Sequence, residues 1–91
     1  MKVYRYVLEK IDAGTETKKI PSENLLGVDN DGETIVVYAL VDSDNLKLVE
    51  YEFKGVMIGI QFELEEGFVF LGTAKTCNNK HSFHVFYKKV V

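Results

Sequence analysis

The 91-residue chain has one cysteine, one proline and no tryptophan. Because Cys77 is the only thiol, an intrachain disulfide and a zinc site built on two thiolates are excluded, and a reducing compartment fits best. Long apolar runs are also missing: five charged residues interrupt residues 1–12, which leaves no room there for a signal peptide or a membrane span. We therefore expect a soluble, cytoplasmic protein.

An excess of positive charge is lacking too, since the formal net charge is -3. Its distribution is uneven. Residues 23–70 carry eleven acidic residues against two lysines, whereas residues 72–91 carry four lysines and no acidic residue. A protein that binds duplex nucleic acid is usually basic overall, because neutralising phosphates supplies much of its affinity. The sequence thus argues against duplex nucleic acid as a partner and leaves the C-terminal quarter as the part that favours an anion.

Apolar residues are abundant, at 46% of the chain, and they recur with a period of two. Such alternation is typical of a half-buried β-strand. It is most regular in residues 56–64, and it recurs in residues 46–54, where the acidic side chains are expected to point outward. Residues 34–42 are apolar on both faces, which predicts a strand that is central or covered on both sides. The apolar face of the first segment consists of Val56, Ile58, Ile60, Phe62 and Leu64.

Further runs rich in β-branched and aromatic residues bring the expected number of short strands to about seven. Turn signals separate many of them, so we expect consecutive strands to pair antiparallel. Pro21 should end the second strand or turn a corner beside it, and Gly72 inside a strand indicates a bulge or a close backbone approach. The remaining strand segments are residues 3–11, 17–20, 23–28, 67–74 and 82–90, and the turn signals are residues 29–32, 42–45, 65–67 and 78–79.

These patterns predict one all-β domain over residues 1–91, a small antiparallel sandwich or barrel of about seven short strands. A domain of this size has a thin core. The doubly apolar strand at residues 34–42 and the face that carries His84 and Phe86 need cover, so we also predict a homo-oligomer.

Two histidines stand three residues apart in the aromatic, basic run KHSFHVFYKK at residues 80–89. On a helix, His81 and His84 would share a face and could chelate a metal, but in a strand an odd separation points them to opposite faces. The neighbouring aromatic and β-branched residues favour a strand. A two-histidine metal site is therefore disfavoured, and His84 is either part of a semi-buried wall or faces a ligand beside Lys88.

Other candidate chemistry has weaker support. Cys77 lies in an expected turn, and no third group is evident that would orient it with a histidine as nucleophile and base. The acidic turns do not match a calcium-binding loop, and Glu65 and Glu66 precede a turn glycine where they stay solvated. No phosphate loop, nucleophile elbow or dinucleotide fingerprint occurs. We expect a protein that is not an enzyme and that takes no cofactor and no metal.

Three segments, VYRYVL, VVYALVDSDN and VFLGTA followed by FHVFY, together resemble a small uncharacterised protein family common in phage and prophage genomes. Tyr38 and Phe83 stand where that family commonly has tryptophan, and residues 56–59 replace a Thr-Gly-His segment. The resemblance implies a phage origin and hence a location in the host cytoplasm. It indicates no particular activity. The matching positions are Ala39, Leu40, Val41, Asp42, Gly72, Thr73, His84, Val85 and Phe86.

These observations favour a phage-encoded, non-enzymatic binding protein, and a counter-defence role is one such function. It would sequester a small anionic, nucleotide-derived ligand or block a host defence protein. In the first case Lys80, Lys88 and His84 would meet phosphate charge, while Tyr38 or Phe86 would stack on a base. In the second case the acidic middle of the chain would mimic phosphates. The alternative from another class is a phage structural or assembly accessory protein with no ligand.

Overall fold

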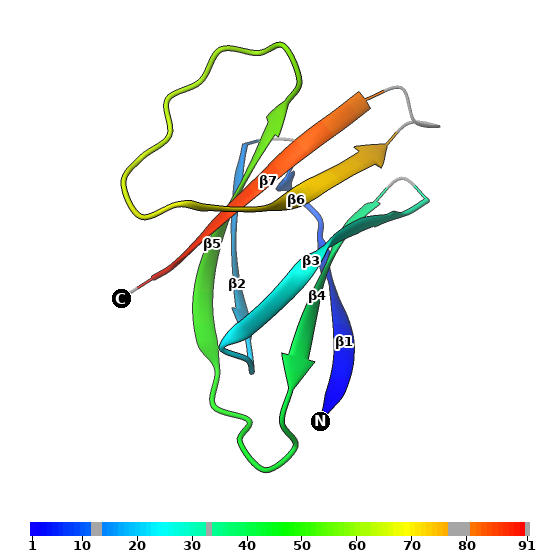
Figure 1. The fold of residues 1–91 in the computed structure, drawn as a ribbon, viewed down its shortest axis with the longest axis vertical. Coiled ribbons are helices and arrows are strands. Elements are labelled where there is room, and N and C mark those ends of the chain that lie inside the picture. The colour runs from blue at the N-terminus through cyan, green and yellow to red at the C-terminus, as the bar shows by residue number, and fades with distance from the viewer. Residues whose placement is uncertain (12–13, 33, 77–80, 91) are drawn as a thin grey trace.

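The computed structural model describes residues 1–11, 14–32, 34–76 and 81–90. These residues form seven strands, and every ladder between them is antiparallel (Figure 1). One sheet has the order β1-β4-β3 and the other the order β2-β5-β7-β6. The prediction of a small antiparallel all-β fold is thus confirmed. The strands are β1 (Lys2–Leu8), β2 (Thr15–Ile20), β3 (Asn24–Asp31), β4 (Thr34–Val41), β5 (Val49–Met57), β6 (Val69–Thr76) and β7 (His81–Lys89).

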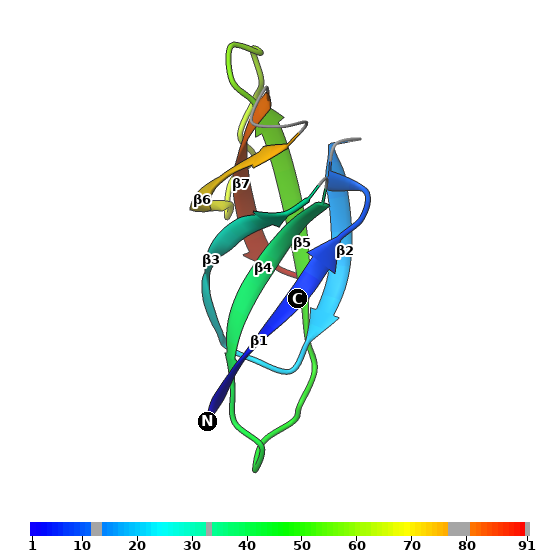
Figure 2. The same cartoon turned by 90° about the vertical axis from the view of Figure 1, so that its right-hand side faces the viewer.

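The two sheets pack face to face as a sandwich (Figure 2). Among the described strands, only β3 with β4 and β6 with β7 are neighbours both along the chain and within a sheet. The expectation that consecutive strands pair is therefore wrong for the other connections. The chain crosses between sheets after β1, β2 and β4, and β7 lies between β5 and β6. Crossing lets each apolar sheet face be covered by the opposite sheet.

Strand β4 is central, as predicted, and its outer face is buried only in part. One face of β4 packs in the core between the sheets. On the other face Val36 is also buried, and an ion pair between Arg5 Nη1 and Asp31 Oδ2, at 2.6 Å, spans it. Arg5 in β1 and Asp31 in β3 pair with the β4 residues on either side of Val36 along that face. The long arginine side chain thus covers an apolar position while its charged end stays in solvent.

The core is tied together by a buried hydrogen bond at one end of the sandwich. Tyr51 is fully buried on β5, and its hydroxyl donates to the backbone oxygen of Ser22 at 2.6 Å. Ser22 follows β2, and its own hydroxyl donates to the carbonyl of Leu40 in β4 at 2.6 Å. The link therefore joins both sheets through the β2–β3 connection. The core cluster comprises Leu8, Ile11, Ile20, Ile35, Val37, Ala39, Tyr51, Phe53, Ala74 and Val85.

Strand β5 joins the end of one predicted strand to the start of the next. The two segments are continuous because Gly55 pairs with Val85 in an unbroken ladder between β5 and β7. A Cβ at Gly55 would lie 2.7 Å from Ile11 Cγ1 and 2.9 Å from the Ile11 backbone oxygen. The glycine therefore lets β5 pass close to the segment that follows β1. The prediction of two separate strands here is wrong.

The predicted strand at residues 56–64 ends after Met57. The amide of Ile60 donates to the carbonyl of Met57 at 3.2 Å, and Gly59 has a φ of 84°. Glycine adopts this conformation at little cost, so the chain turns away from the ladder. Residues 58–68 form the β5–β6 loop, the wide green-to-yellow arc in Figure 1.

Other strand ends, bulges and turns occur where the sequence predicts them. Strand β2 ends at Ile20, directly before Pro21, as predicted. At Gly72 the β6–β7 register shifts, and a Cβ there would lie 2.9 Å from Val28 Cγ2 in β3, so the predicted bulge with a close approach is confirmed. Turns occur at residues 42–45 and 65–67, whereas residues 78–79 lie outside the described residues. No helix that could cross a membrane occurs in the described part of the chain.

Candidate functional site

The candidate site is the outer face of the sheet β2-β5-β7-β6. In β7 the residues opposite the outward-facing positions of β5 are His84, Phe86 and Lys88. They share this face because alternate residues of a strand point the same way. His81 has the other phase and lies on the opposite side of β7 from His84. The predicted separation of the two histidines is therefore confirmed.

Aromatic rings form a row across this outer face. The ring of Phe62 lies 5.8 Å from that of Phe86, Phe86 lies 5.6 Å from Phe70, and Phe70 lies 6.3 Å from His84. These centroid separations are typical of tilted and edge-to-face aromatic contacts. We call Phe62, Phe70, His84 and Phe86 the aromatic face. It is open to solvent, since Phe70 is 55% exposed.

The imidazole of His84 is held in place from β6. Thr73 is its cross-strand partner, and Thr73 Oγ1 and His84 Nδ1 are hydrogen-bonded at 2.9 Å. A hydrogen bond at one ring nitrogen fixes the orientation of the ring and directs the other nitrogen away from that partner. The described residues contain no group of three or more His, Cys, Asp or Glu side chains placed to hold a metal ion.

The β5–β6 loop borders the aromatic face and is attached to the sheet by a few contacts. Phe68 is buried at the end of the loop. Lys54 Nζ donates to the backbone oxygen of Glu63 at 2.9 Å and lies 6.0 Å from the centre of the Phe62 ring. Between these anchors the loop presents apolar side chains to solvent, with exposed fractions from 42% to 65%, at Ile58, Ile60, Phe62 and Leu64.

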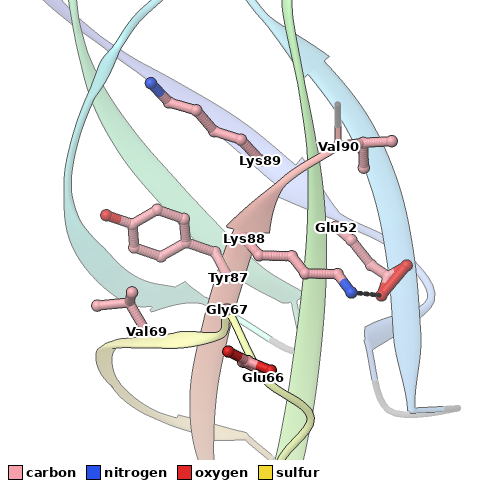
Figure 3. A pocket seen from close by; sticks show the side chains of 8 residues that line it. All are labelled: Glu52, Glu66, Gly67, Val69, Tyr87, Lys88, Lys89 and Val90. Carbon is pink, nitrogen blue, oxygen red and sulfur yellow. Dashed lines mark ion pairs between the residues drawn. The ribbon is translucent and has the colours of Figure 1, made fainter.

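Lys88 lies in a groove of about 700 Å³ where the end of the β5–β6 loop passes the C-terminal end of β7 (Figure 3). Its Nζ atom is 3.9 Å from Glu52 Oε1, 3.7 Å from Glu65 Oε2 and 4.8 Å from the centre of the Phe68 ring. Lys88, which the sequence predicted to bind an anion, thus already has two carboxylates of the same chain beside it. The groove is lined by Glu52, Glu66, Gly67, Val69, Tyr87, Lys88, Lys89 and Val90.

The remaining predicted ligand residues do not join this cluster. Tyr38 is on the outer face of β4 in the other sheet, so it lies across the sandwich from Phe86. Lys80 lies outside the described residues, as does Cys77. Lys89, in the groove beside Lys88, forms an ion pair with Glu23. Of the five predicted residues, the structure brings together His84, Phe86 and Lys88.

Sequence reasoning missed Phe70 and Thr73 as members of this surface and placed Phe62 in a strand. The signal for Thr73 was available, because a regular β6–β7 hairpin sets it opposite His84. Phe70 faces outward because the bulge shifts the register between Phe70 and Gly72. The sequence predicted a bulge at Gly72 but not its consequence, which is that Phe70 faces outward.

Comparison with known proteins identifies the family of the chain. No curated protein and no solved structure matches the chain. A family model described as a domain of unknown function, DUF7352, matches residues 1–91. Since the match covers the whole sequence, the chain belongs to the DUF7352 family.

Proposed function

We propose that this protein is a small, non-enzymatic binding protein that docks another protein on its aromatic face. The observation that carries the proposal is the row of rings on the aromatic face, in which Phe70 is 55% exposed. Soluble proteins rarely leave contiguous apolar surface uncovered, and larger patches mark interaction sites. Aromatic residues are also the most enriched class at the centres of protein interfaces.

The charges around the aromatic face favour a protein over a strongly anionic ligand. Lys88 is flanked by Glu52 and Glu65, and Lys54 is engaged by the β5–β6 loop. Cations at the edge of a surface that already have partners within the protein resemble the polar rim of a protein interface, where charges set orientation and add little affinity. The partner expected from this pattern has an apolar, aromatic-compatible centre and mixed charges around it.

Phe70→Ser tests the proposal, with Val3→Ser as the matched control. Val3 is 56% exposed on the outer face of the other sheet, so both substitutions remove an equally exposed apolar side chain from an outer strand. Each should change the free energy of unfolding by no more than about 1 kcal/mol. Binding of a partner should weaken by about tenfold or more for Phe70→Ser alone, as is usual when an interface aromatic residue is truncated.

The measurement is affinity capture with the wild type and both variants, followed by titration of the recovered protein by calorimetry. A partner that binds the wild type and Val3→Ser but is lost with Phe70→Ser supports the proposal. A partner that binds all three proteins equally well would show that docking uses another surface.

A small ligand with a planar ring is a second candidate, favoured by the hydrogen bond between Thr73 and His84. This bond holds the imidazole beside the exposed Phe70 ring, and stacking on such rings tolerates any nucleobase. Mass spectrometry of the supernatant from purified, denatured protein should then detect a nucleotide-derived compound. Its loss from Phe70→Ser preparations would place it on the aromatic face, whereas a clean supernatant from the wild type speaks against this candidate.

The resemblance of residues 3–8, 36–45, 69–74 and 83–87 to a family common in phage and prophage genomes adds a proposal about origin. A phage-encoded binding protein of this kind would act stoichiometrically on a host protein, and a counter-defence role fits that mode of action. A structural or assembly role in the virion is the alternative. Capture from host lysate compared with capture from purified phage particles separates the two.

A further inference from the structure

Residues 58–64 have the sequence of a strand and the structure of a loop. Large apolar residues alternate with Gly59, Gln61 and Glu63, which is the pattern of a strand with one buried face. In the fold this face is uncovered: Ile58, Ile60, Phe62 and Leu64 are 65%, 56%, 42% and 45% exposed. An alternating segment with its apolar face in solvent lacks the partner that its pattern predicts.

The backbone of this segment is also largely unpaired. Among the described residues, its backbone-to-backbone hydrogen bonds outside the ladders are Ile58 N to Ser82 O, at 3.0 Å, and Ile60 N to Met57 O, at 3.2 Å. Both lie at its start. From residue 61 to residue 64 the amides have no backbone partner in the described chain, and a row of amides without backbone partners is a template for another strand.

We propose that residues 58–64 pair antiparallel with the same residues of a second copy of this chain. Pairing about a two-fold axis at Gln61 sets Ile58 opposite Leu64 and Ile60 opposite Phe62, so large apolar side chains meet along the whole strand. Seven residues is an ordinary length for a strand. Phe62 belongs to both this segment and the aromatic face, but the tests are separate, because the docking test substitutes Phe70 and the pairing test substitutes Gln61 and Glu63.

The charges of the segment are compatible with this self-pairing. Glu63 would stand opposite Gly59 of the other copy, so no acidic residue opposes another. The two Glu63 side chains would be four residues apart along the strands, or about 14 Å, which exceeds the screening length of about 8 Å at physiological salt. In this register, apolar side chains of one copy stand beside apolar side chains of the other, and the acidic side chains stay apart.

The turn at Gly59 explains how the segment can take both forms. Its φ of 84° ends β5 in the single chain, but glycine moves between positive and extended φ at little steric cost. The hydrogen bond from Lys54 Nζ to the Glu63 oxygen and the packing of Phe62 on Phe86 hold the segment against the outer face of β5 and β7. Because the segment is already partly ordered in the single chain, pairing with a second copy costs less conformational entropy, which favours association.

Cysteine cross-linking tests the register, in a Cys77→Ser background where the introduced thiol is the only one. Gln61 and Glu63 are both exposed in the same loop. In the proposed pair the two Gln61 Cα atoms are about 4.5 to 5.5 Å apart, within the range of a disulfide, while the two Glu63 positions are too distant. Under mild oxidation Gln61→Cys should form a cross-linked dimer at least tenfold faster than Glu63→Cys.

Sedimentation of the wild type from about 1 µM to about 1 mM, the span of weak affinities, should show a shift from monomer to dimer. Ile60→Asp, at an exposed loop position, should abolish the shift and leave the circular dichroism spectrum unchanged. A wild type that stays monomeric overturns the proposal, and so does a dimer in which Gln61→Cys cross-links no faster than Glu63→Cys. Both results leave the capture experiment on the aromatic face unaffected.

Discussion

The buried hydroxyl of Tyr51 should contribute measurably to stability, and Tyr51→Phe isolates it. The substitution keeps the ring, which packs at 5.8 Å from Tyr87 and 6.1 Å from Phe53, and removes only the donor to the Ser22 carbonyl at 2.6 Å. A typical hydrogen bond contributes about 1 kcal/mol, and a buried carbonyl left without a donor costs about 1 to 3 kcal/mol. We expect Tyr51→Phe to lower the free energy of unfolding by about 1 to 3 kcal/mol.

The same hydroxyl makes the stability depend on pH. Burial, and then the charges of Glu23 and Tyr87, raise the pKa of Tyr51 from 10.0 to about 12. Between these values the unfolded chain releases the phenolic proton and the folded chain keeps it, so the folded state loses stability as the pH rises from about 10 to about 12. The stabilisation is complete below pH 10. The difference in the free energy of unfolding between the wild type and Tyr51→Phe should therefore become smaller above pH 10.

Urea denaturation followed by circular dichroism at pH 7 and at steps up to pH 12 measures both effects. For a domain of this size, 1 kcal/mol corresponds to about 4 to 8 °C in Tm, so thermal melting gives a second readout. Tyr4→Phe is the control, because Tyr4 is half-exposed on β1 and should change stability by less than about 0.5 kcal/mol. A Tyr51→Phe variant as stable as the Tyr4→Phe variant would refute the role assigned to the buried link.

Three further predictions concern packing, each measured by urea denaturation. Gly55→Ala should destabilise by about 1 to 3 kcal/mol, because its Cβ would meet Ile11 at 2.7 Å, whereas Gly27→Ala has open space and should be nearly neutral; equal effects would contradict the close approach. Phe68→Ala should cost about 3 kcal/mol through loss of the buried loop anchor, and a neutral result would mean that the loop is not held there. Arg5→Ala should cost at most about 1 kcal/mol, since both members of its ion pair with Asp31 are exposed; a larger loss would mean that its stem is essential cover.

Several features could be predicted because they depend on local pattern alone. A period of two is a property of the strand itself, so it identified the all-β class and placed His84, Phe86 and Lys88 on one face of β7. The end of β2 before Pro21 follows from the missing amide of proline. The doubly apolar run became the central strand β4, since apolar residues on both faces require cover on both sides.

The end of β5 could not be predicted in this way. Residues 46–54 and 56–64 both alternate, and nothing in the alternation says where a ladder partner stops. The ladder with β7 runs through Gly55 and joins their adjoining ends into one strand, and the turn at Gly59 leaves the remainder as a loop. Alternation reports the preference of a segment for the strand form, whereas hydrogen-bonded partners decide whether the strand forms.

The candidate site shows the same division between the sequence and the tertiary structure. The sequence by itself determined the chemistry of the C-terminal strand: an imidazole, aromatic rings and lysines on known faces. Only the tertiary structure brought Glu52 and Glu65 to Lys88, turned Phe70 outward through the bulge, and put Tyr38 on the far side of the sandwich. These outcomes depend on register and on contacts between residues far apart in the chain, and such contacts leave no trace in the local periodicity of one sequence.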